Sequence, residues 1–161
     1  MVSGIIAHSD MWDNKENAMS IEQNQAIVRR CFQEIDRQNL DILDELCTPN
    51  FVAHFPGVPG PQTRAAIKPI WGQFFAAFPN LHHTIESIIA EGDRVVVRLT
   101  ISAVQTGPFM GIPPTSRAIS IGSINFFRFE GSAIAEQWID YNALGMMQQL
   151  GAIPFPQQAT A

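Results

Sequence analysis

The spacing of apolar residues along the chain changes once, near residue 80. Before that point apolar positions recur every three or four residues, as on one face of an α-helix. After it they alternate with polar positions, as in a β-strand. We therefore expect helices in the first half of the chain and strands in the second. Helices followed by hairpin-linked strands predict an α+β fold, with helices on one face of an antiparallel sheet.

Three helices are expected before residue 80. The first begins within 20–23, where Ser-Ile-Glu-Gln fits a capping box. Its apolar face consists of residues at helical spacing, namely Val28, Cys31, Phe32 and Ile35. A short helix follows over 41–47 and a longer one over 63–78. Because Pro69 lies inside the third helix, that helix either kinks there or begins near Lys68.

Four strands are expected after residue 80, over 82–90, 94–104, 118–129 and 133–141. The turns at 91–93 and 130–132 join neighbouring strands into hairpins. A loop rich in glycine and proline spans 106–116, and a second one spans 56–61 after a short extended segment. A last helix over 142–150 completes the pattern.

Composition predicts one domain, at 20–151, between an N-terminal tail at 1–19 and a C-terminal tail at 152–161. The chain has 161 residues, of which 46% are hydrophobic and 16% charged, with a net charge of −5. A negative balance disfavours nucleic-acid binding. The most apolar stretch, 87–104, contains four charged residues, which argues against a membrane span. Since the N-terminus does not resemble a signal peptide, we expect a cytoplasmic protein.

The sequence contains no familiar motif for a metal, a cofactor or a nucleophile. His82 and His83 are adjacent, so on a strand they point to opposite faces and do not bind one ion together. We expect one packed and one exposed histidine. Cys31 and Cys47 lie on apolar helix faces, which predicts two reduced and inert thiols. We therefore expect chemistry without a metal or a cofactor.

Acidic residues in the last strand are the candidates for acid/base chemistry. By alternation Ile134, Glu136, Trp138 and Asp140 share one face. A carboxylate near a tryptophan in an apolar strand is costly to ionise without a partner, and this suits a general acid or base. Asp140 either has this role or caps the following helix, whereas Glu136 fits a rim or surface residue better.

Seven short segments form a set that is specific when taken together. They are Val52–His54, Phe78–Leu81, Ile89–Val95, Phe109–Thr115, Phe127–Gly131, Glu136–Asp140 and Gln148–Gly151. Together they resemble the SnoaL-like polyketide cyclase (ester cyclase) family over residues 20–151. The resemblance implies the NTF2-like fold, a cone whose curved antiparallel sheet is wrapped by about three helices around a cavity. It also implies homodimers or tetramers built through the sheet.

The resemblance further implies metal-free general acid/base chemistry of the intramolecular aldol type. Its substrate is a hydrophobic poly-carbonyl or otherwise enolisable small molecule, and no cofactor takes part. Asp140 matches the family's acid/base aspartate near the end of the last long strand, and His54 is the second catalytic candidate. Gln105 stands where many members have a histidine; with Asn125 it is a candidate polar partner of the substrate.

Several alternatives stay open at this point. The aromatic candidates either line the cavity or pack in the core; they are Trp71, Phe74, Phe127 and Trp138. His54 and Asn125 have equally simple structural interpretations as hydrogen-bonded residues. Hydrolysis of epoxides in the same fold requires Arg98, Asn125 and Asp140 to converge. A non-catalytic ligand-binding or interaction module predicts a cavity filled by phenylalanine and methionine side chains.

Overall fold

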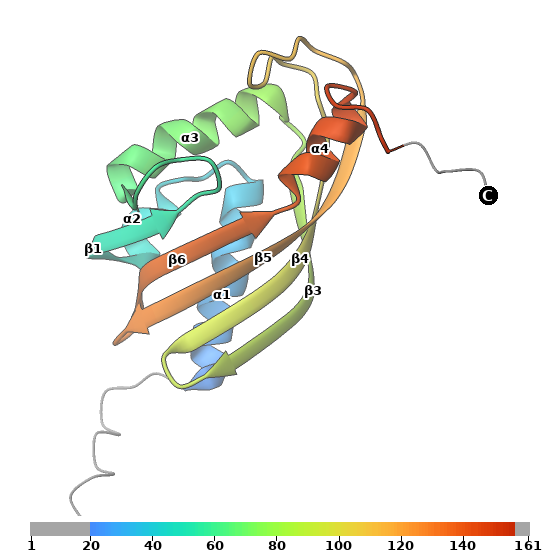
Figure 1. Cartoon of the computed structure of the whole chain (residues 1–161). Helices are drawn as coiled ribbons and strands as arrows, with labels where there is room; N and C mark the ends of the chain where they lie inside the picture. Colours follow the sequence, from blue (N-terminus) through green and yellow to red (C-terminus); the bar gives the residue numbers. More distant parts are fainter. Residues whose placement is uncertain (1–19, 157–161) are drawn as a thin grey trace, which may run out of the picture.

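The computed structural model describes residues 20–156 and has an α+β architecture, as predicted. Six strands form one curved sheet in the order β2-β1-β6-β5-β4-β3 (Figure 1). All neighbouring strands are antiparallel except β1 and β6, which are parallel. The parallel pair departs from the expected antiparallel sheet. The tails at 1–19 and 157–161 lie outside the described residues.

The expected helices and strands are present in the expected order. The helices are α1 (Ile21–Asp36), α2 (Ile42–Leu46), α3 (Arg64–Ala77) and α4 (Ala143–Leu150). The strands are β1 (Cys47–His54), β2 (Gln62–Thr63), β3 (His82–Glu91), β4 (Arg94–Val104), β5 (Ala118–Glu130) and β6 (Ala133–Tyr141). The two-residue strand β2 was not predicted. Within 20–156, no helix is long and apolar enough to cross a membrane.

Helix α1 forms as its sequence predicts. Gln23 N donates to Ser20 Oγ at 3.2 Å and Ser20 N donates to Gln23 Oε1 at 2.8 Å, which is the expected capping box. The predicted apolar face is buried. Both cysteines are free and buried, and burial raises the pKa of the Cys31 thiol to about 12 and the pKa of Cys47 further still. The expectation of two unpaired, packed thiols is confirmed, but Cys47 begins β1 and does not lie on a helix face as expected.

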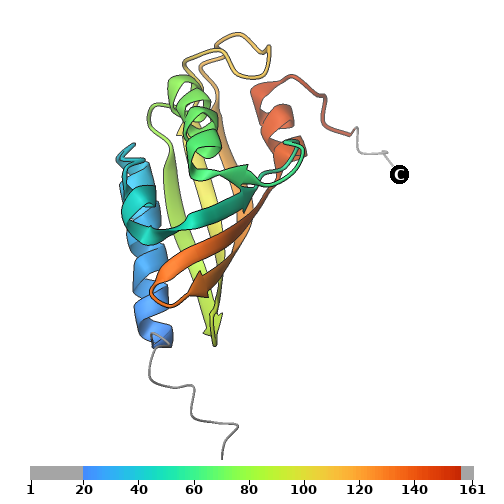
Figure 2. The same cartoon turned by 90° about the vertical axis from the view of Figure 1, so that its left-hand side faces the viewer.

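Helix α3 runs without interruption through Pro69. Thr63 Oγ1 accepts a hydrogen bond from Ala66 N at 3.3 Å and so caps its first turn. The alternative start near Lys68 is therefore wrong. Figure 2 shows α1 along one side of the sheet and α3 over its upper end. We call the face of the sheet that these helices cover the inner face and the opposite one the outer face.

Buried and more exposed side chains alternate along β5, and this alternation shows which residues lie on each face of the sheet. Every second residue from Ile119 to Phe129 is buried on the inner face. A β-bulge interrupts the pairing with β6, because Arg128 pairs with Glu136 while Phe129 pairs with Ile134. Ile134 is consequently buried on the inner face, and the expectation that it shares a face with Glu136 is wrong.

Candidate functional site

The inner face of the sheet encloses a cavity of about 30 Å³ between α1, α3 and the strands. Four polar side chains reach it, those of His83, Ser123, Asn125 and Tyr141. The remaining wall is apolar and mostly aromatic, formed by Phe32, Phe55, Trp71, Phe74, Leu81, Ile101 and Ile139. This volume holds about one water molecule, whereas sites for small ligands measure roughly 300–1,000 Å³. The cavity is therefore closed by its own aromatic side chains.

His83 is the buried titratable group of this cavity, and Asp36 holds it there. Asp36 is the last residue of α1 and His83 is the second residue of β3. Gln38 Nε2 donates to Pro79 O at 3.0 Å, which ties the end of α1 to the segment before β3. His83 Nδ1 then lies 2.6 Å from Asp36 Oδ1, and His83 N donates to both carboxylate oxygens at 3.2 and 3.1 Å.

This contact fixes which ring nitrogen of His83 can act as a base. An ionised carboxylate only accepts hydrogen bonds, so Nδ1 carries the proton that faces Asp36. In the neutral imidazole, Nε2 then holds the lone pair. Among the hydrogen bonds within 20–156, those of His83 run from Nδ1 and the backbone N to Asp36, and Nε2 takes part in none. The ring packs against Phe32 and Trp71, at centroid distances of 5.1 and 6.0 Å. A histidine that is oriented in this way at an apolar cavity is able to act as a general base.

The position of Asp36 is electrostatically unfavourable for the helix alone. A carboxylate at a helix C-terminus meets the negative end of the helix dipole. Two histidines compensate for this, since His82 Nδ1 lies 2.8 Å from Asp36 Oδ2 while His83 occupies the other oxygen. One histidine is exposed and one is packed, as predicted, since the His82 side chain is 63% exposed and that of His83 is 2% exposed. No pattern in the sequence indicates that both reach one carboxylate.

An amide network lies beside the cavity on β5 and β6. Gln137 Nε2 donates to Asn125 Oδ1 at 3.0 Å, and Asn125 Nδ2 donates to Ser123 Oγ at 3.0 Å. Ser123 Oγ in turn donates to the backbone carbonyl oxygen of Asp140 at 2.7 Å. All three side chains are buried. Such connected polar groups hold fixed dipoles in an apolar interior, where they act strongly on a developing charge.

Tyr141 adds a phenol to the same cavity. Its ring lies edge-on to Phe74 at a centroid distance of 6.2 Å. Burial raises the pKa of Tyr141 above its ordinary value of 10, so the phenol is neutral at physiological pH. A neutral phenol is able to donate a hydrogen bond to an oxygen that gains negative charge.

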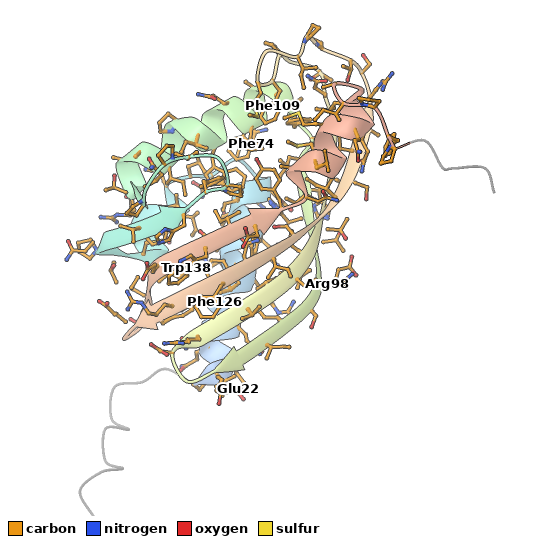
Figure 3. All side chains as sticks on the ribbon, viewed as in Figure 1. Glu22, Phe74, Arg98, Phe109, Phe126 and Trp138 are labelled. Carbon is orange, nitrogen blue, oxygen red and sulfur yellow. The ribbon has the colours of Figure 1, made fainter. Side chains whose placement is uncertain are left out.

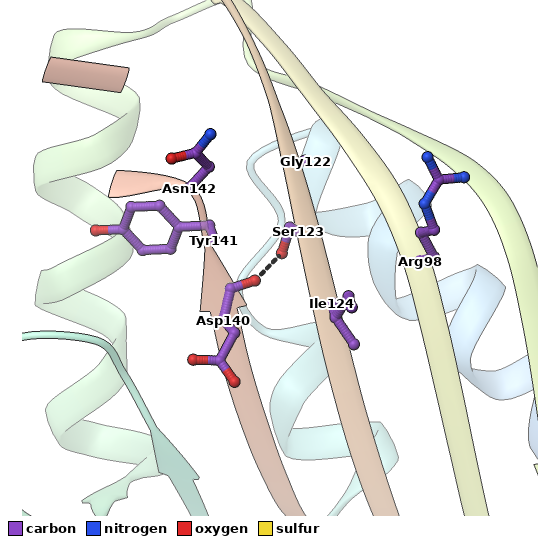
Figure 4. A pocket seen from close by; sticks show the side chains of 7 residues that line it. All are labelled: Arg98, Gly122, Ser123, Ile124, Asp140, Tyr141 and Asn142. Carbon is purple, nitrogen blue, oxygen red and sulfur yellow. Dashed lines mark hydrogen bonds between the residues drawn. The ribbon is translucent and has the colours of Figure 1, made fainter. Parts of the chain in front are cut away.

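Asp140 lies on the outer face, away from this cavity. It pairs with Ile124, and both side chains are exposed. The two line an open groove of about 390 Å³, in which Ile124 separates Asp140 from Arg98 (Figure 4). Asn125 is on the other side of the sheet. The expectation that Asn125 and Asp140 face one cavity is therefore wrong, and Arg98, Asn125 and Asp140 do not converge as epoxide hydrolysis would require.

The helix-cap interpretation of Asp140 is also wrong. Asn142 is the cap of α4, because its Oδ1 accepts a hydrogen bond from Gly145 N at 2.8 Å. The side chain of Asp140 thus neither caps the helix nor reaches the interior. It stands in the outer groove, which makes that groove the only place where a catalytic role for Asp140 can be sought.

His54 and Trp138 also lie on the outer face. Their rings stack at 5.2 Å with an interplanar angle of 4°, and Phe126 meets Trp138 edge-on at 5.2 Å. Trp138 and Phe126 are visible on the front of the sheet in Figure 3, on the side opposite α1. His54 Nε2 is 2.9 Å from Glu136 Oε1, and Arg128 Nε donates to Glu136 Oε2 at 3.3 Å. His54 is therefore paired with Glu136 and not with Asp140.

Glu136 should contribute to stability at neutral pH. The hydrogen bond from His54 and then the one from Arg128 lower the pKa of Glu136 below its ordinary value of 4.5. The stabilisation is thus fully present above pH 4.5 and is lost as the pH falls through the lower, folded-state pKa. We expect Glu136→Gln to lower the free energy of unfolding at pH 7 by about 0.5–1 kcal/mol, since the pair is partly solvated. In urea titrations, a difference between the two proteins that does not shrink at pH 3 would contradict this.

The other predicted substrate-binding residues divide into two groups. Trp71 and Phe74 of α3 line the inner cavity, as does Asn125. Phe127 is buried in the core and does not line the cavity. Gln105 is fully buried and anchors the 106–116 loop, since its Nε2 donates to Gly107 O at 3.1 Å and its Oε1 accepts from Thr115 Oγ1 at 2.6 Å. Phe127 and Gln105 therefore hold the fold together beside the site.

Sequence reasoning missed the Asp36–His83 pair and the amide of Gln137. A usable signal existed for Gln137, because it alternates with Ile139 and Tyr141 on the apolar face of the last strand. For His83, alternation with Ile85 indicated an inward position, but nothing in the sequence connects residue 36 with residue 83. Among residues 20–156, no group of three or more histidine, cysteine, aspartate or glutamate side chains is placed to hold a metal ion.

Comparisons with known proteins agree with this architecture. A family model described as SnoaL-like polyketide cyclase matches residues 26–150. IdmH from Streptomyces antibioticus, a candidate polyketide cyclase, is 28% identical with a TM-score of 0.73, over 80% of this chain and 99% of that one. AclR from Streptomyces galilaeus, a candidate hydroxylase, is 26% identical with a TM-score of 0.77, over 84% and 89% of the two chains. No curated protein matches the sequence.

Proposed function

Since the chain belongs to the SnoaL-like polyketide cyclase family, with the NTF2-like fold, we propose that it is a cyclase or isomerase of hydrophobic, enolisable small molecules. In this proposal the chemistry is metal-free general acid/base catalysis of the intramolecular aldol type. The observation that carries it is the Asp36–His83 pair. Asp36 holds Nδ1 of the His83 ring, and this buried ring lines an apolar cavity. The likeness to IdmH, a candidate cyclase, supports the same reaction class.

His83 is the general base and later the general acid. Its Nε2 takes a proton from the carbon between two carbonyl groups, which leaves an enolate and an imidazolium. Asp36 stabilises the imidazolium through the 2.6 Å contact at Nδ1. The enolate carbon attacks a second carbonyl group of the same molecule, and the new alkoxide takes the proton back from Nε2. Proton and charge are balanced over the cycle.

Neutral donors around the cavity serve the oxyanion. Asn125 and Tyr141 line it; Asn125 Nδ2 keeps a second N–H beside the one it donates to Ser123 Oγ, and burial keeps the phenol of Tyr141 protonated. A hydrogen bond from a neutral donor stabilises negative charge without introducing a permanent charge into the cavity. The extended conjugation of a poly-carbonyl compound makes its C–H proton more acidic and so lowers the basicity required of the base, and few polar groups suffice.

Substrate entry requires the aromatic wall to move. The closed cavity of about 30 Å³ admits no ring compound, and Trp71, Phe74 and Phe55 form its wall towards α3 and the loop at 55–61. In the proposed mechanism these side chains swing outward on binding and close over the bound molecule. Such closure also excludes water from the enolate.

A ligand panel tests the proposal. Wild type is incubated with anthraquinone-type esters, β-diketones, enones and epoxides, and turnover is followed by mass spectrometry and binding by the shift in melting temperature. We expect conversion of a β-diketone or poly-carbonyl ester, at a rate that a chelator leaves unchanged. A ligand present at 100 times its dissociation constant adds about 2.7 kcal/mol of stability.

Asp140→Asn is the matched comparison, because the outer groove is the second candidate centre. Turnover that persists in Asp140→Asn and disappears in His83→Gln supports the inner cavity. The reverse result would move the active site to the groove formed with Arg98 and Ile124. Binding without turnover in any variant would favour the non-catalytic module.

A homodimer through the outer face of the sheet belongs to the same proposal. Ile124 of β5 and Ile89 of β3 are apolar and exposed there, and uncovered apolar surface on a sheet favours association. We expect sedimentation at micromolar concentration to give a dimer for wild type and a monomer for Ile124→Glu. Leu144→Glu, at an exposed leucine on α4, is the control that should stay dimeric. A monomeric wild type would contradict the dimer.

A further inference from the structure

His83 is connected to solvent by a continuous line of titratable groups. A surface groove of about 310 Å³ lies between α1 and β3, separate from the outer groove beside Asp140. His83 and Phe32 line both this groove and the inner cavity, so they form the wall between the two. On the solvent side of that wall stand Asp36 and His82.

The distances along this line suit proton transfer. Asp36 Oδ1 is 2.6 Å from His83 Nδ1, and Asp36 Oδ2 is 2.8 Å from His82 Nδ1. Exposure rises along the same path, from 2% for the His83 side chain through 15% for Asp36 to 63% for His82. We propose that Asp36 and His82 form a proton relay through which the buried His83 exchanges protons with solvent.

Each transfer in the relay conserves the proton and the charge. When His83 has taken a proton at Nε2, its Nδ1 passes the other proton to Asp36 Oδ1, and Asp36 becomes a neutral carboxylic acid. His82 is 63% exposed, so exchange with water moves its own proton from Nδ1 to Nε2, and a half-turn about the Asp36 Cβ–Cγ bond then brings the carboxylic proton to the lone pair on His82 Nδ1. His82 then releases a proton from Nε2 to water. The reverse order brings a proton inward.

The relay deepens the proposed function and rests on His83 being the base. It removes the positive charge from the buried imidazole when product leaves without taking back the proton. Other polar groups that face these residues are Arg29 and Gln33 of α1, in the groove, and Tyr141 of β6, in the cavity.

Hydrogen exchange at His83 tests the relay without any substrate. In protein labelled with ¹⁵N-histidine, saturation transfer from water measures the exchange rate of the His83 Nδ1 proton. We expect His82→Gln to slow this exchange at least tenfold, because glutamine reaches Asp36 but cannot carry a proton. Added imidazole should restore the rate, since the groove that His82 occupies is open to small molecules.

His54→Gln is the matched control, as it makes the same change at a histidine paired with Glu136 on the outer face. It should leave the exchange at His83 unchanged. Wild-type exchange in His82→Gln, or slowed exchange that imidazole does not restore, would overturn the relay. If instead the relay is observed while His83→Gln retains full turnover, the relay stands and the proposed function fails.

Discussion

Replacing His83 by glutamine should lower kcat by a factor of about 10²–10⁴ on the compound that the wild type converts, which is the range for loss of a general base. Glutamine has a similar length and can donate to Asp36, but its amide does not take up a proton. The decrease in kcat therefore measures the loss of proton transfer and not a change in the shape of the cavity. KM should change little, because Trp71, Phe74 and the other apolar lining residues stay in place. Steady-state kinetics on the best compound of the panel gives both numbers.

Asp36→Asn tests whether Asp36 acts on His83 by orienting its ring or by its negative charge. Asparagine still accepts a hydrogen bond from His83 Nδ1 but no longer stabilises the imidazolium, so we expect a smaller loss of kcat than for His83→Gln. Melting temperatures verify that both variants are folded. Full activity in folded His83→Gln would contradict the assignment of the base.

The order of the expected elements and the bounds of the long strands were accessible from the sequence because the apolar period is strong. The strands expected at 94–104 and 133–141 coincide with β4 and β6. In both, alternating side chains face either a packed interior or solvent, and that contrast shapes the sequence directly. The parallel pairing of β1 with β6 was not accessible, since it joins residues more than eighty positions apart.

The site was less accessible because it depends on which face of each strand turns inward. Alternation groups Glu136, Trp138 and Asp140 correctly, but it does not say that this group faces outward. The bulge opposite Arg128 also shifts Ile134 to the inner face, which no local pattern indicates. His82 and His83 reach one carboxylate only because the edge strand β3 begins beside the end of α1. Long-range contacts of this kind leave no periodic signal.

Phe127→Ala should lower the free energy of unfolding by about 3–5 kcal/mol, the usual cost of emptying a buried phenylalanine site. The side chain is 0% exposed on the inner face of β5, and its ring meets Phe32 of α1 edge-on at 5.9 Å. It therefore joins the sheet to the helix that carries Asp36. Because strands and α1 are both held by this contact, the cavity left by alanine cannot close without moving one of them. Denaturant unfolding at pH 7 measures the loss.

Phe126→Ala is the control, since it makes the same change one residue earlier in the same strand. Phe126 is only half-buried, on the outer face, where it contacts Trp138 at 5.2 Å and lies under the Arg94 guanidinium at 5.9 Å. An aromatic contact of this kind contributes about 1 kcal/mol. The difference between the two variants therefore reports directly which face of β5 is the interior. Equal losses would mean that the assignment of inner and outer faces is wrong, and with it the separation of His83 from Asp140.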